Sequence, residues 1–495
     1  MSVKVLCIEK RGASSSNVLP TNQFHNMSET SWTIPNFQGD IITPTHPEYP
    51  QAIARWAANA ERRAKVVAFV KDEQDVVRAL KYAKENLLPI AVRGGGHNPT
   101  GASSIVDGLV IDLSRYFSGV RADPEKKLVY VGGGAVWGSV DEECIKHGLA
   151  GVAGTVSHTG VAGLALGGGY GWLTAAYSVV SDNIVQVTLV TAAGEVLTVN
   201  ESENADLYFA IRGGGGNLGV VTEFVFRIYP QRKTVYTGTI YYPALAGEKL
   251  IKATQEWLSR RTEKESVCLF VAIGRHGEPI FVVMPFYNGS EAEGRKCFKG
   301  LLDAGPFKDA SKEMPYENLN TLINPMADHG HGQYMKGVMI QEFHQSTVTK
   351  IHQRLAEMYA ESAGAFRMSV LYQLFAHDKV DAIPQETTAF RREKGITNAL
   401  VLFDWDHDPQ NDRTDQARKY VHELCELALE GQPGETKQGE KIGYSNYDPD
   451  AAVTSTVAVD KAKAVFGANY PRLQAIKKLY DPENIFNKWF PIVPL

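Results

Sequence analysis

A histidine that directly follows three glycines is the first stretch of this sequence that could do chemistry. His97 comes after glycines at positions 94–96, and an apolar strand is predicted just before them at residues 90–92. Backbone without Cβ atoms can wrap closely around a ligand and turn several N–H groups toward an anion. We predict a loop that holds a phosphate-bearing cofactor, with the ring of His97 in contact with it. A tight turn with a solvated histidine is the alternative, because short glycine motifs also arise by chance.

Further glycines gather in clusters up to residue 219, most of them beside a predicted strand. The densest stretch is residues 151–171, where eight of 21 residues are glycine. Each glycine costs a regular helix or strand roughly 0.5–1 kcal/mol relative to alanine. We interpret this density as backbone that lies directly against something flat or anionic.

Composition and charge exclude several classes of protein. The chain has 495 residues, enough for two or three domains, and its net charge of −5 argues against a nucleic-acid partner. No apolar run approaches the roughly 18 residues of a membrane span. No signal-peptide core is present either, so we expect an intracellular location, with secretion left open. Five scattered cysteines without a CxxC pair argue against a disulfide framework and a zinc site.

The elements expected around the glycine clusters begin with a strand, a helix and a strand at residues 66–70, 72–86 and 90–92, the spacing of a βαβ unit. Helices are also predicted at 51–60 and 136–147, a hairpin at 185–199 and a strand at 220–229. From about 233 to 440 the glycine clusters stop. Strands at 234–242, 267–273, 279–287, 366–375 and 399–405 alternate there with helices at 247–260, 291–304, 346–363 and 412–429, which predicts an α+β domain with an antiparallel sheet. A last helix is expected at 460–479.

Six segments in a fixed order carry a family resemblance: Arg93-Gly-Gly-Gly-His97, Leu166-Gly-Gly-Gly-Tyr-Gly171, Arg212-Gly-Gly-Gly-Gly-Asn-Leu-Gly219, Tyr444-Ser-Asn-Tyr447, Phe466-Gly-Ala-Asn-Tyr-Pro-Arg-Leu473 and Tyr480-Asp-Pro-Glu-Asn-Ile-Phe486. Together they resemble the berberine bridge enzyme-like group of FAD-linked oxidases, in the vanillyl-alcohol oxidase superfamily. The resemblance implies an α+β fold: a two-part PCMH-type FAD-binding domain, and a substrate domain with an antiparallel sheet flanked by helices. We expect a flexible leader at 1–40, the FAD-binding domain at 41–232 completed by 441–495, and the substrate domain at 233–440.

The resemblance also supplies the cofactor and its contacts. FAD is expected to be linked covalently through His97 alone, because Val156 stands where many members carry a second, cysteinyl link. Thr159 occupies the position that controls oxygen access in the family, which leaves oxidase and dehydrogenase both open. The expected cofactor-binding residues are Arg93, Gly94, Gly95, Gly96, His97, Asn98, Ser103, Gly154, Thr155, Ser157, Thr159, Gly160, Gly163, Gly167, Gly168, Gly169, Tyr170, Asn183, Val221, Tyr444 and Asn446.

The proton acceptor is harder to assign, since relatives often place a carboxylate or tyrosine on a middle-domain strand upstream of a Thr-Ala-Phe. Here the corresponding strand offers Leu374, or Gln373 if one residue is inserted. Attention moves to Tyr444, the first tyrosine of its motif, with Tyr372 as a second candidate. A tyrosine has a pKa near 10 and needs a cation or hydrogen-bond donors to act near neutral pH.

Lys336 is the expected source of that positive charge, and His158, Tyr334 and Trp405 are expected beside it as substrate-binding residues. Each of three candidates has a structural alternative: a core position for Tyr372, a buried tyrosine bonded to backbone for Tyr444, and a loop histidine bonded to nearby carbonyls for His158. No metal is expected at His329, His331 and His344, because no carboxylate-rich frame surrounds them.

These observations predict a flavoprotein that removes a hydride from an alcohol, amine or activated C–H of a small organic molecule, with molecular oxygen as acceptor and a place in specialised-metabolite biosynthesis. Two alternatives stay open. One is a cyclase on the same fold, including a cycloaddition catalyst, which the missing strand carboxylate would suit. The other is a non-catalytic protein that binds flavin or a small molecule.

Overall fold

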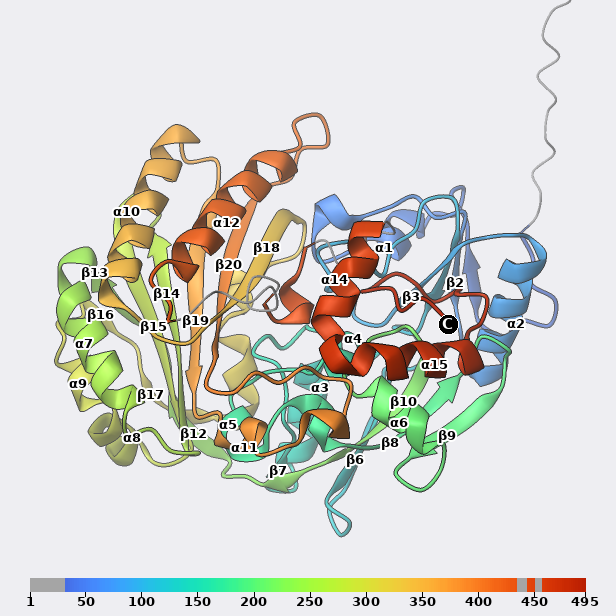
Figure 1. Cartoon of the computed structure of the whole chain (residues 1–495), viewed down its shortest axis with the longest axis horizontal. Helices are drawn as coiled ribbons and strands as arrows, with labels where there is room; N and C mark the ends of the chain where they lie inside the picture. Colours follow the sequence, from blue (N-terminus) through green and yellow to red (C-terminus); the bar gives the residue numbers. More distant parts are fainter. Residues whose placement is uncertain (1–31, 434–442, 450–455) are drawn as a thin grey trace, which may run out of the picture. The chain divides into compact units, whose positions relative to one another are not determined.

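Two small sheets in the first 230 residues carry the glycine loops (Figure 1). The computed structural model describes residues 32–433, 443–449 and 456–495. The first sheet has the order β1-β2-β4-β3, with strands β1 (Asp40–Ile42), β2 (Val66–Phe69), β4 (Leu109–Asp112) and β3 (Ile90–Arg93). Strands β2 and β3 both run parallel to β4, which lies between them. The expected strand–helix–strand order is thus confirmed, but its two strands are not neighbours.

The second sheet is antiparallel and has the order β5-β6-β10-β8-β9. Its strands are β5 (Val120–Asp123), β6 (Leu128–Gly132), β10 (Val220–Arg227), β8 (Ile184–Val190) and β9 (Val196–Asn200). Strands β8 and β9 form the predicted hairpin. A separate two-stranded pair joins β7 (Leu149–Ala150) to β11 (Tyr229–Pro230).

A nine-stranded antiparallel sheet contains the strands of residues 234–406. Its main path is β16-β13-β15-β14-β19-β20-β18, and β12 and β17 pair beside it. The bounds are β12 (Thr234–Thr237), β13 (Ile240–Pro243), β14 (Glu265–Ile273), β15 (Pro279–Tyr287), β16 (Lys308–Asp309), β17 (Lys312–Pro315), β18 (His331–Ile340), β19 (Arg367–Phe375) and β20 (Thr397–Asp406). Helices α7 (Gly247–Leu258), α10 (Gln345–Glu361) and α12 (Thr414–Leu429) cover one face of this sheet (Figure 1). The other face is turned toward the glycine loops.

The remaining α-helices have between four and 13 residues. They are α1 (Tyr49–Ile53), α2 (Glu73–Glu85), α3 (Trp137–Ile145), α4 (Val161–Leu166), α5 (Thr174–Tyr177), α6 (Ala205–Ile211), α8 (Glu291–Cys297), α9 (Lys299–Leu302), α11 (Asp378–Asp381), α14 (Thr456–Phe466) and α15 (Tyr470–Tyr480). None of the helices within the described residues is long and apolar enough to cross a membrane.

Several expected elements differ from those observed. The strand expected at 234–242 breaks into β12 and β13 around Gly238, whose φ of 141° few other residues adopt. The helix expected at 460–479 is interrupted by a 3₁₀ turn at Gly467–Asn469, and that expected at 51–60 stops at Ile53. Strand β18 was not predicted at all. Of the expected leader, residues 1–31 lie outside the described residues, as does the expected boundary at 440/441.

Candidate active site

A large cavity opens between the glycine loops and the uncovered face of the nine-stranded sheet. Its empty volume is about 1930 Å³, including the solvent at its mouth. Segments far apart in the sequence line it: the loop after β3, the loop at 154–160 with helix α4, strands β14, β18, β19 and β20, and residues 485–489. A cavity of this size that collects loops from several elements is the first candidate for a cofactor and substrate site.

Close backbone approach explains part of the glycine density. A Cβ atom on Gly95 would lie 2.5 Å from the Cα of Gly160, and one on Gly171 would lie 1.8 Å from the carbonyl oxygen of Ala153. These glycines therefore let two stretches of chain touch each other. Backbone that lies against a ligand can explain only those glycines that line the cavity, among them Gly94, Gly95 and Gly160.

His97 lies in the cavity wall just after β3, where the glycine turn delivers its ring. Its ring stacks on Trp56 at 4.2 Å between centroids, and on its other neighbour, His158, at 5.1 Å. Burial, with the nearby His158 and His329 rings, lowers the pKa of His97 to about 3. The imidazole is therefore neutral at physiological pH. Its Nε2 atom is buried and has no hydrogen-bond partner among the described residues, which marks it as a group that a ligand would satisfy.

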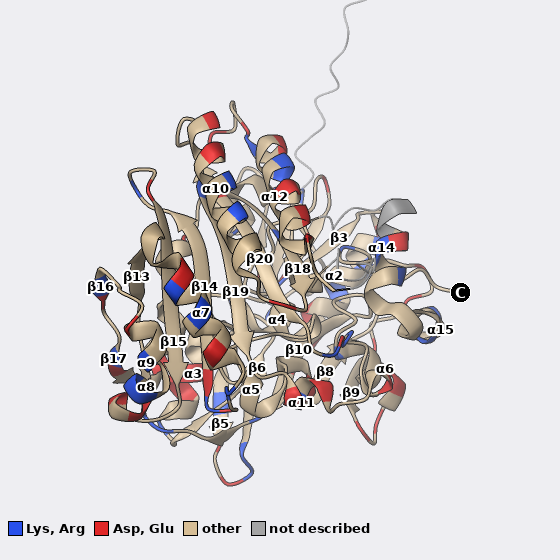
Figure 2. Ribbon diagram, turned by 60° about the vertical axis from the view of Figure 1, so that its left-hand side comes forward, with Lys and Arg blue, Asp and Glu red and all other residues tan. Residues whose placement is uncertain are grey.

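The sheet wall of the cavity is apolar. Phe270, Leu371 and Leu400 stand side by side across β14, β19 and β20, and the next row brings Leu402 beside Met335. Charged residues are also rare on the central strands: in Figure 2 the outer helices carry Lys and Arg (blue) and Asp and Glu (red), whereas the central strands are mostly tan.

Charged groups are almost excluded from the lining. No aspartate or glutamate is present among the described residues that line the cavity, and the only lysine or arginine is Lys488. Burial lowers the pKa of Lys488, and the amine makes no ion pair with a described residue. The cavity thus suits a ligand that is largely apolar and carries negative charge at one place.

One tyrosine of the Tyr-Ser-Asn-Tyr motif reaches the cavity, and it is Tyr447. Its hydroxyl oxygen accepts a hydrogen bond of 3.1 Å from the side-chain amide of Gln373 on β19. The other amide atom of Gln373, Oε1, is buried and unpartnered among the described residues. Burial raises the pKa of Tyr447 above that of a free tyrosine. Sequence reasoning missed this residue as a site residue, although the motif contains it.

Tyr444, the expected proton acceptor, lies behind the glycine loop instead. Its hydroxyl oxygen accepts hydrogen bonds from the backbone N–H of Gly169 at 2.7 Å and from Asn446 at 2.6 Å. Burial raises its pKa well above the ordinary value. Tyr444 does not line the main cavity. In this position it holds the turn at Gly169 in place.

The expected cofactor residues divide into two groups. Those that line the cavity are Gly94, Gly95, Gly96, His97, Asn98, Ser103, Gly154, Thr155, Thr159, Gly160, Gly163, Tyr170, Val221 and Asn446. The others support it from behind: Arg93 pairs with Asp112, and Asn183 bonds the carbonyls of residues 177 and 179. Ser157, Gly167, Gly168 and Gly169 also lie outside the lining.

The expected catalytic and substrate residues on the sheet do not meet at the cavity. Tyr372, Tyr334 and Trp405 are buried in the core beneath helices α10 and α12, on the opposite face from Leu371 and Met335. Neighbouring residues of a strand point to opposite faces, so a one-residue shift in the assumed register moves a side chain away from the site.

The two remaining substrate candidates are Lys336 and His158. Lys336 faces Asp448, 3.6 Å away. His158 alone of the four substrate candidates lies near the site, beside His97.

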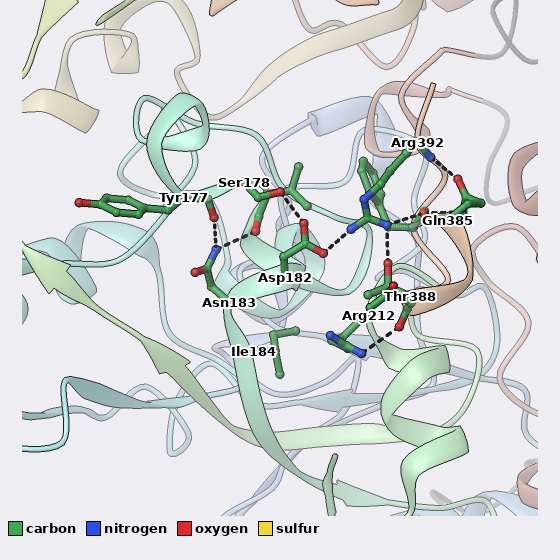
Figure 3. A network of polar contacts seen from close by, with 12 residues as sticks. Tyr177, Ser178, Asp182, Asn183, Ile184, Arg212, Gln385, Thr388 and Arg392 are labelled. Carbon is green, nitrogen blue, oxygen red and sulfur yellow. Dashed lines mark hydrogen bonds and ion pairs between the residues drawn. The ribbon is translucent and has the colours of Figure 1, made fainter. Parts of the chain in front are cut away.

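A loop of the middle segment is fastened onto the glycine-rich part by a polar network (Figure 3). Arg392 forms a buried ion pair with Asp182, whose second oxygen accepts from Ser178. Arg392 also donates to Thr388 Oγ1 at 2.7 Å. The network presses Phe390 of the Thr-Ala-Phe segment against the glycine backbone at 168 and 213.

These residues fit FAD. The apolar walls suit a flavin ring system, the carboxylate-free lining suits a dinucleotide diphosphate, and the unpartnered Nε2 of His97 suits a bond or contact at the ring. Val156 lines the cavity and has no nucleophile.

Comparison with known proteins agrees with this site. The FAD binding domain family model matches residues 64–200, and the berberine and berberine-like model matches residues 443–491. The FAD-linked oxidoreductase pgmH of Aspergillus terreus is 32% identical over 474 residues, covering 90% of this chain and 92% of the relative. The (R)-6-hydroxynicotine oxidase of Paenarthrobacter nicotinovorans is 28% identical, with 94% and 99% covered.

Solved structures give the same result. The crystal structure of 6-hydroxy-D-nicotine oxidase from Arthrobacter nicotinovorans superimposes with a TM-score of 0.81 at 26% identity, covering 93% of this chain and 98% of that one. A berberine bridge enzyme variant in complex with (S)-reticuline shares the fold, with a TM-score of 0.79 at 18% identity, covering 93% and 97%. With an α+β fold of this type and both family models matched, the chain belongs to the berberine bridge enzyme-like family of FAD-linked oxidoreductases.

Proposed function

We propose that the protein is an FAD-linked oxidase that holds its flavin through His97 and removes a hydride from an alcohol, amine or activated C–H of a small organic molecule. The observation that carries the proposal is the imidazole of His97, whose buried Nε2 has no hydrogen-bond partner among the described residues, at the wall of a large apolar cavity. We assign FAD binding to residues 41–232 with 441–495, substrate binding to 233–440, and the reaction to the making of a specialised metabolite. Intracellular placement belongs to the same proposal.

FAD, when bound, takes up the hydride and passes two electrons to an acceptor. The chain's own residues would supply orientation, exclusion of water and a proton acceptor. We assign the last role to Tyr447, since its phenol lines the cavity, in place of Tyr444. Gln373 supports this role because its amide N–H donates to the phenol oxygen and would stabilise a phenolate.

Molecular oxygen is the proposed acceptor. Thr159 lines the cavity beside the glycine loop, and its side chain is small. A small side chain at this position leaves a path for oxygen to the flavin, which favours an oxidase over a dehydrogenase.

The substrate that fits the lining is neutral and largely apolar. Across the sheet wall the lining offers aliphatic and aromatic side chains, with the hydroxyls of Ser369 and Tyr447 as polar groups. A sugar needs many hydrogen-bond partners, and a charged substrate needs a counter-ion; the described lining supplies neither on this wall.

The test is anaerobic mixing of the purified flavoprotein with paired compounds, such as a neutral aromatic alcohol and its carboxylate analogue, and an oligosaccharide. We expect the neutral aromatic compound to bleach the visible flavin absorbance and the other two to leave it unchanged. Admission of air should restore the colour and release hydrogen peroxide. Bleaching by the oligosaccharide or the carboxylate alone would contradict the proposed substrate class, and slow recovery in air would contradict an oxidase.

A further inference from the structure

The imidazole of His97 stacks against two other rings. The planes of Trp56 and His97 are 10° apart, and those of His158 and His97 are 29° apart. A third imidazole, His329, stands edge-on to His97 at 6.4 Å and packs against His158 at 4.6 Å. We call Trp56, His158 and His329 the ring clamp. Ring pairs at these distances are attractive and orient one another.

Trp56 is anchored by its backbone as well as by its side chain. Its N–H donates to the carbonyl of Gly96 at 3.1 Å, and its own carbonyl accepts from Gly330 at 3.2 Å. The indole N–H donates to the carbonyl of Ala327 at 2.7 Å. These bonds tie the glycine turn before His97 to the 327–330 loop that carries His329. The clamp is therefore built from three separate segments and is rigid on the side of Trp56.

The chemistry of the three histidines argues against a metal. No group of three His, Cys, Asp or Glu side chains in the described part of the chain is arranged to hold a metal ion. The rings of His97 and His158 stack, whereas those of His158 and His329 are tilted by 53°. Burial lowers the pKa of His158 and of His329 as well as that of His97, in keeping with a stack of neutral rings.

We propose that the ring clamp positions His97 for its covalent bond to the flavin: Trp56 and His158 fix the plane of the imidazole, so that one ring nitrogen points into the cavity. Trp56, His158 and His329 are positioning residues, since they act through His97. This inference rests on the proposed attachment of FAD through His97 and assigns the residues that make attachment efficient.

In the proposed attachment, a ring nitrogen of His97 would bond to the carbon of a methyl group on the flavin. The N–H hydrogen and one methyl hydrogen would be lost together with two electrons, which the flavin would take up. Molecular oxygen would then accept these electrons and both protons and leave as hydrogen peroxide. A nucleophile that is misplaced by about 1 Å loses on the order of 10²-fold in rate, so a loosened ring should slow this step strongly.

The experiment measures how fast the flavin becomes covalently attached when FAD is added to flavin-free protein, by acid precipitation at time points and absorbance of the pellet. We expect His158→Ala to slow attachment by about tenfold or more. His158→Phe keeps a flat ring and should restore the rate. His147→Ala, at a half-exposed histidine just after α3 whose Nε2 lies 3.9 Å from Glu143, is the matched control and should behave as wild type.

The possible outcomes distinguish failure of the covalent link at His97 from failure of the ring clamp. If wild type attaches no flavin at all, the proposed function fails at His97, whatever the clamp does. If wild type attaches flavin and His158→Ala attaches it equally fast, the clamp is overturned while the proposed function stands. Equal slowing in His158→Ala and His158→Phe would also overturn it, since the ring nitrogens and not the ring would then matter. Trp56→Phe, which keeps a ring but loses the bond to Ala327, should lie between wild type and His158→Ala.

Discussion

Tyr444 and Tyr447 stand at the two ends of one short motif, and a 3₁₀ turn over Ser445–Tyr447 sends their phenols to different places. The first bonds Gly169 behind the glycine loop, and the second reaches the cavity. The motif could be found from the sequence, but not the direction of each side chain. The same holds for His158 and His329, which lie 171 positions apart in sequence and meet only in the fold.

Tyr447→Phe should slow anaerobic reduction of the flavin by about 10²-fold or more, because it removes the proposed proton acceptor. The amount of bound flavin should not change. Stopped-flow absorbance with a substrate identified by bleaching measures the rate. Tyr372→Phe is the matched control, since the hydroxyl of Tyr372 is buried on the other face of β19 and has no hydrogen-bond partner among the described residues. Similar slowing in both variants would refute the assignment.

At the scale of elements, the periodic helices and the long middle strands were predictable, whereas β18 was not. Its sequence contains two glycines and a lysine and shows no clear alternation, so only its pairing with β20 along ten residues makes it a strand. The consequence is functional, because Met335 of β18 belongs to the cavity wall. Long-range pairing of this kind leaves no local signal in a sequence.

The Arg392–Asp182 pair is expected to stabilise the contact between the loop after β19 and the glycine-rich part. Both side chains are nearly fully buried. Arg392→Met should lower the free energy of unfolding in urea by about 3–5 kcal/mol, because it leaves a buried carboxylate without its partner. Lys299→Met, in an exposed pair with Asp303, should change it by less than about 1 kcal/mol. Equal effects of the two substitutions would contradict this account of the network.

The contact of α3 with the turn at Tyr316–Thr321 should make stability depend on pH through Asp141. Burial raises the pKa of this carboxyl to about 7, and Asn320 donates to it at 2.6 Å. Between about pH 4 and pH 7 the folded state keeps a proton on Asp141 that the unfolded chain releases. The contribution of Asp141 to the free energy of unfolding is therefore full below about pH 4 and is lost as the pH rises through about 7.

The side chain of Asn in Asp141→Asn needs no proton. As the pH rises from about 5 to about 8, the free energy of unfolding of this variant should increase relative to that of wild type by on the order of 2 kcal/mol. Urea unfolding of both proteins across this range is the measurement. Parallel pH profiles for the two proteins would show that Asp141 does not hold the proton.

At the scale of the whole molecule, the C-terminal segment returns to complete the site beside the glycine loops (Figure 1). Lys477 of α15 fixes this return: its buried ammonium group donates to the carbonyls of Asn217 and Phe486 and pairs with Asp481. Residues 485–489 then lie in the cavity wall. The resemblance to the family anticipated that the last segment joins the first. The individual contacts follow only from the fold.

The measurement that tests the central claim most directly is the fate of the flavin when the purified protein is denatured in acid and filtered. We predict that the yellow colour stays with the polypeptide in wild type and passes into the filtrate in His97→Ala, which should still bind FAD in the cavity. Colour that leaves wild type completely would contradict a covalent link at His97. A folded wild-type protein without any flavin, even after addition of FAD, would contradict the account of the cavity itself.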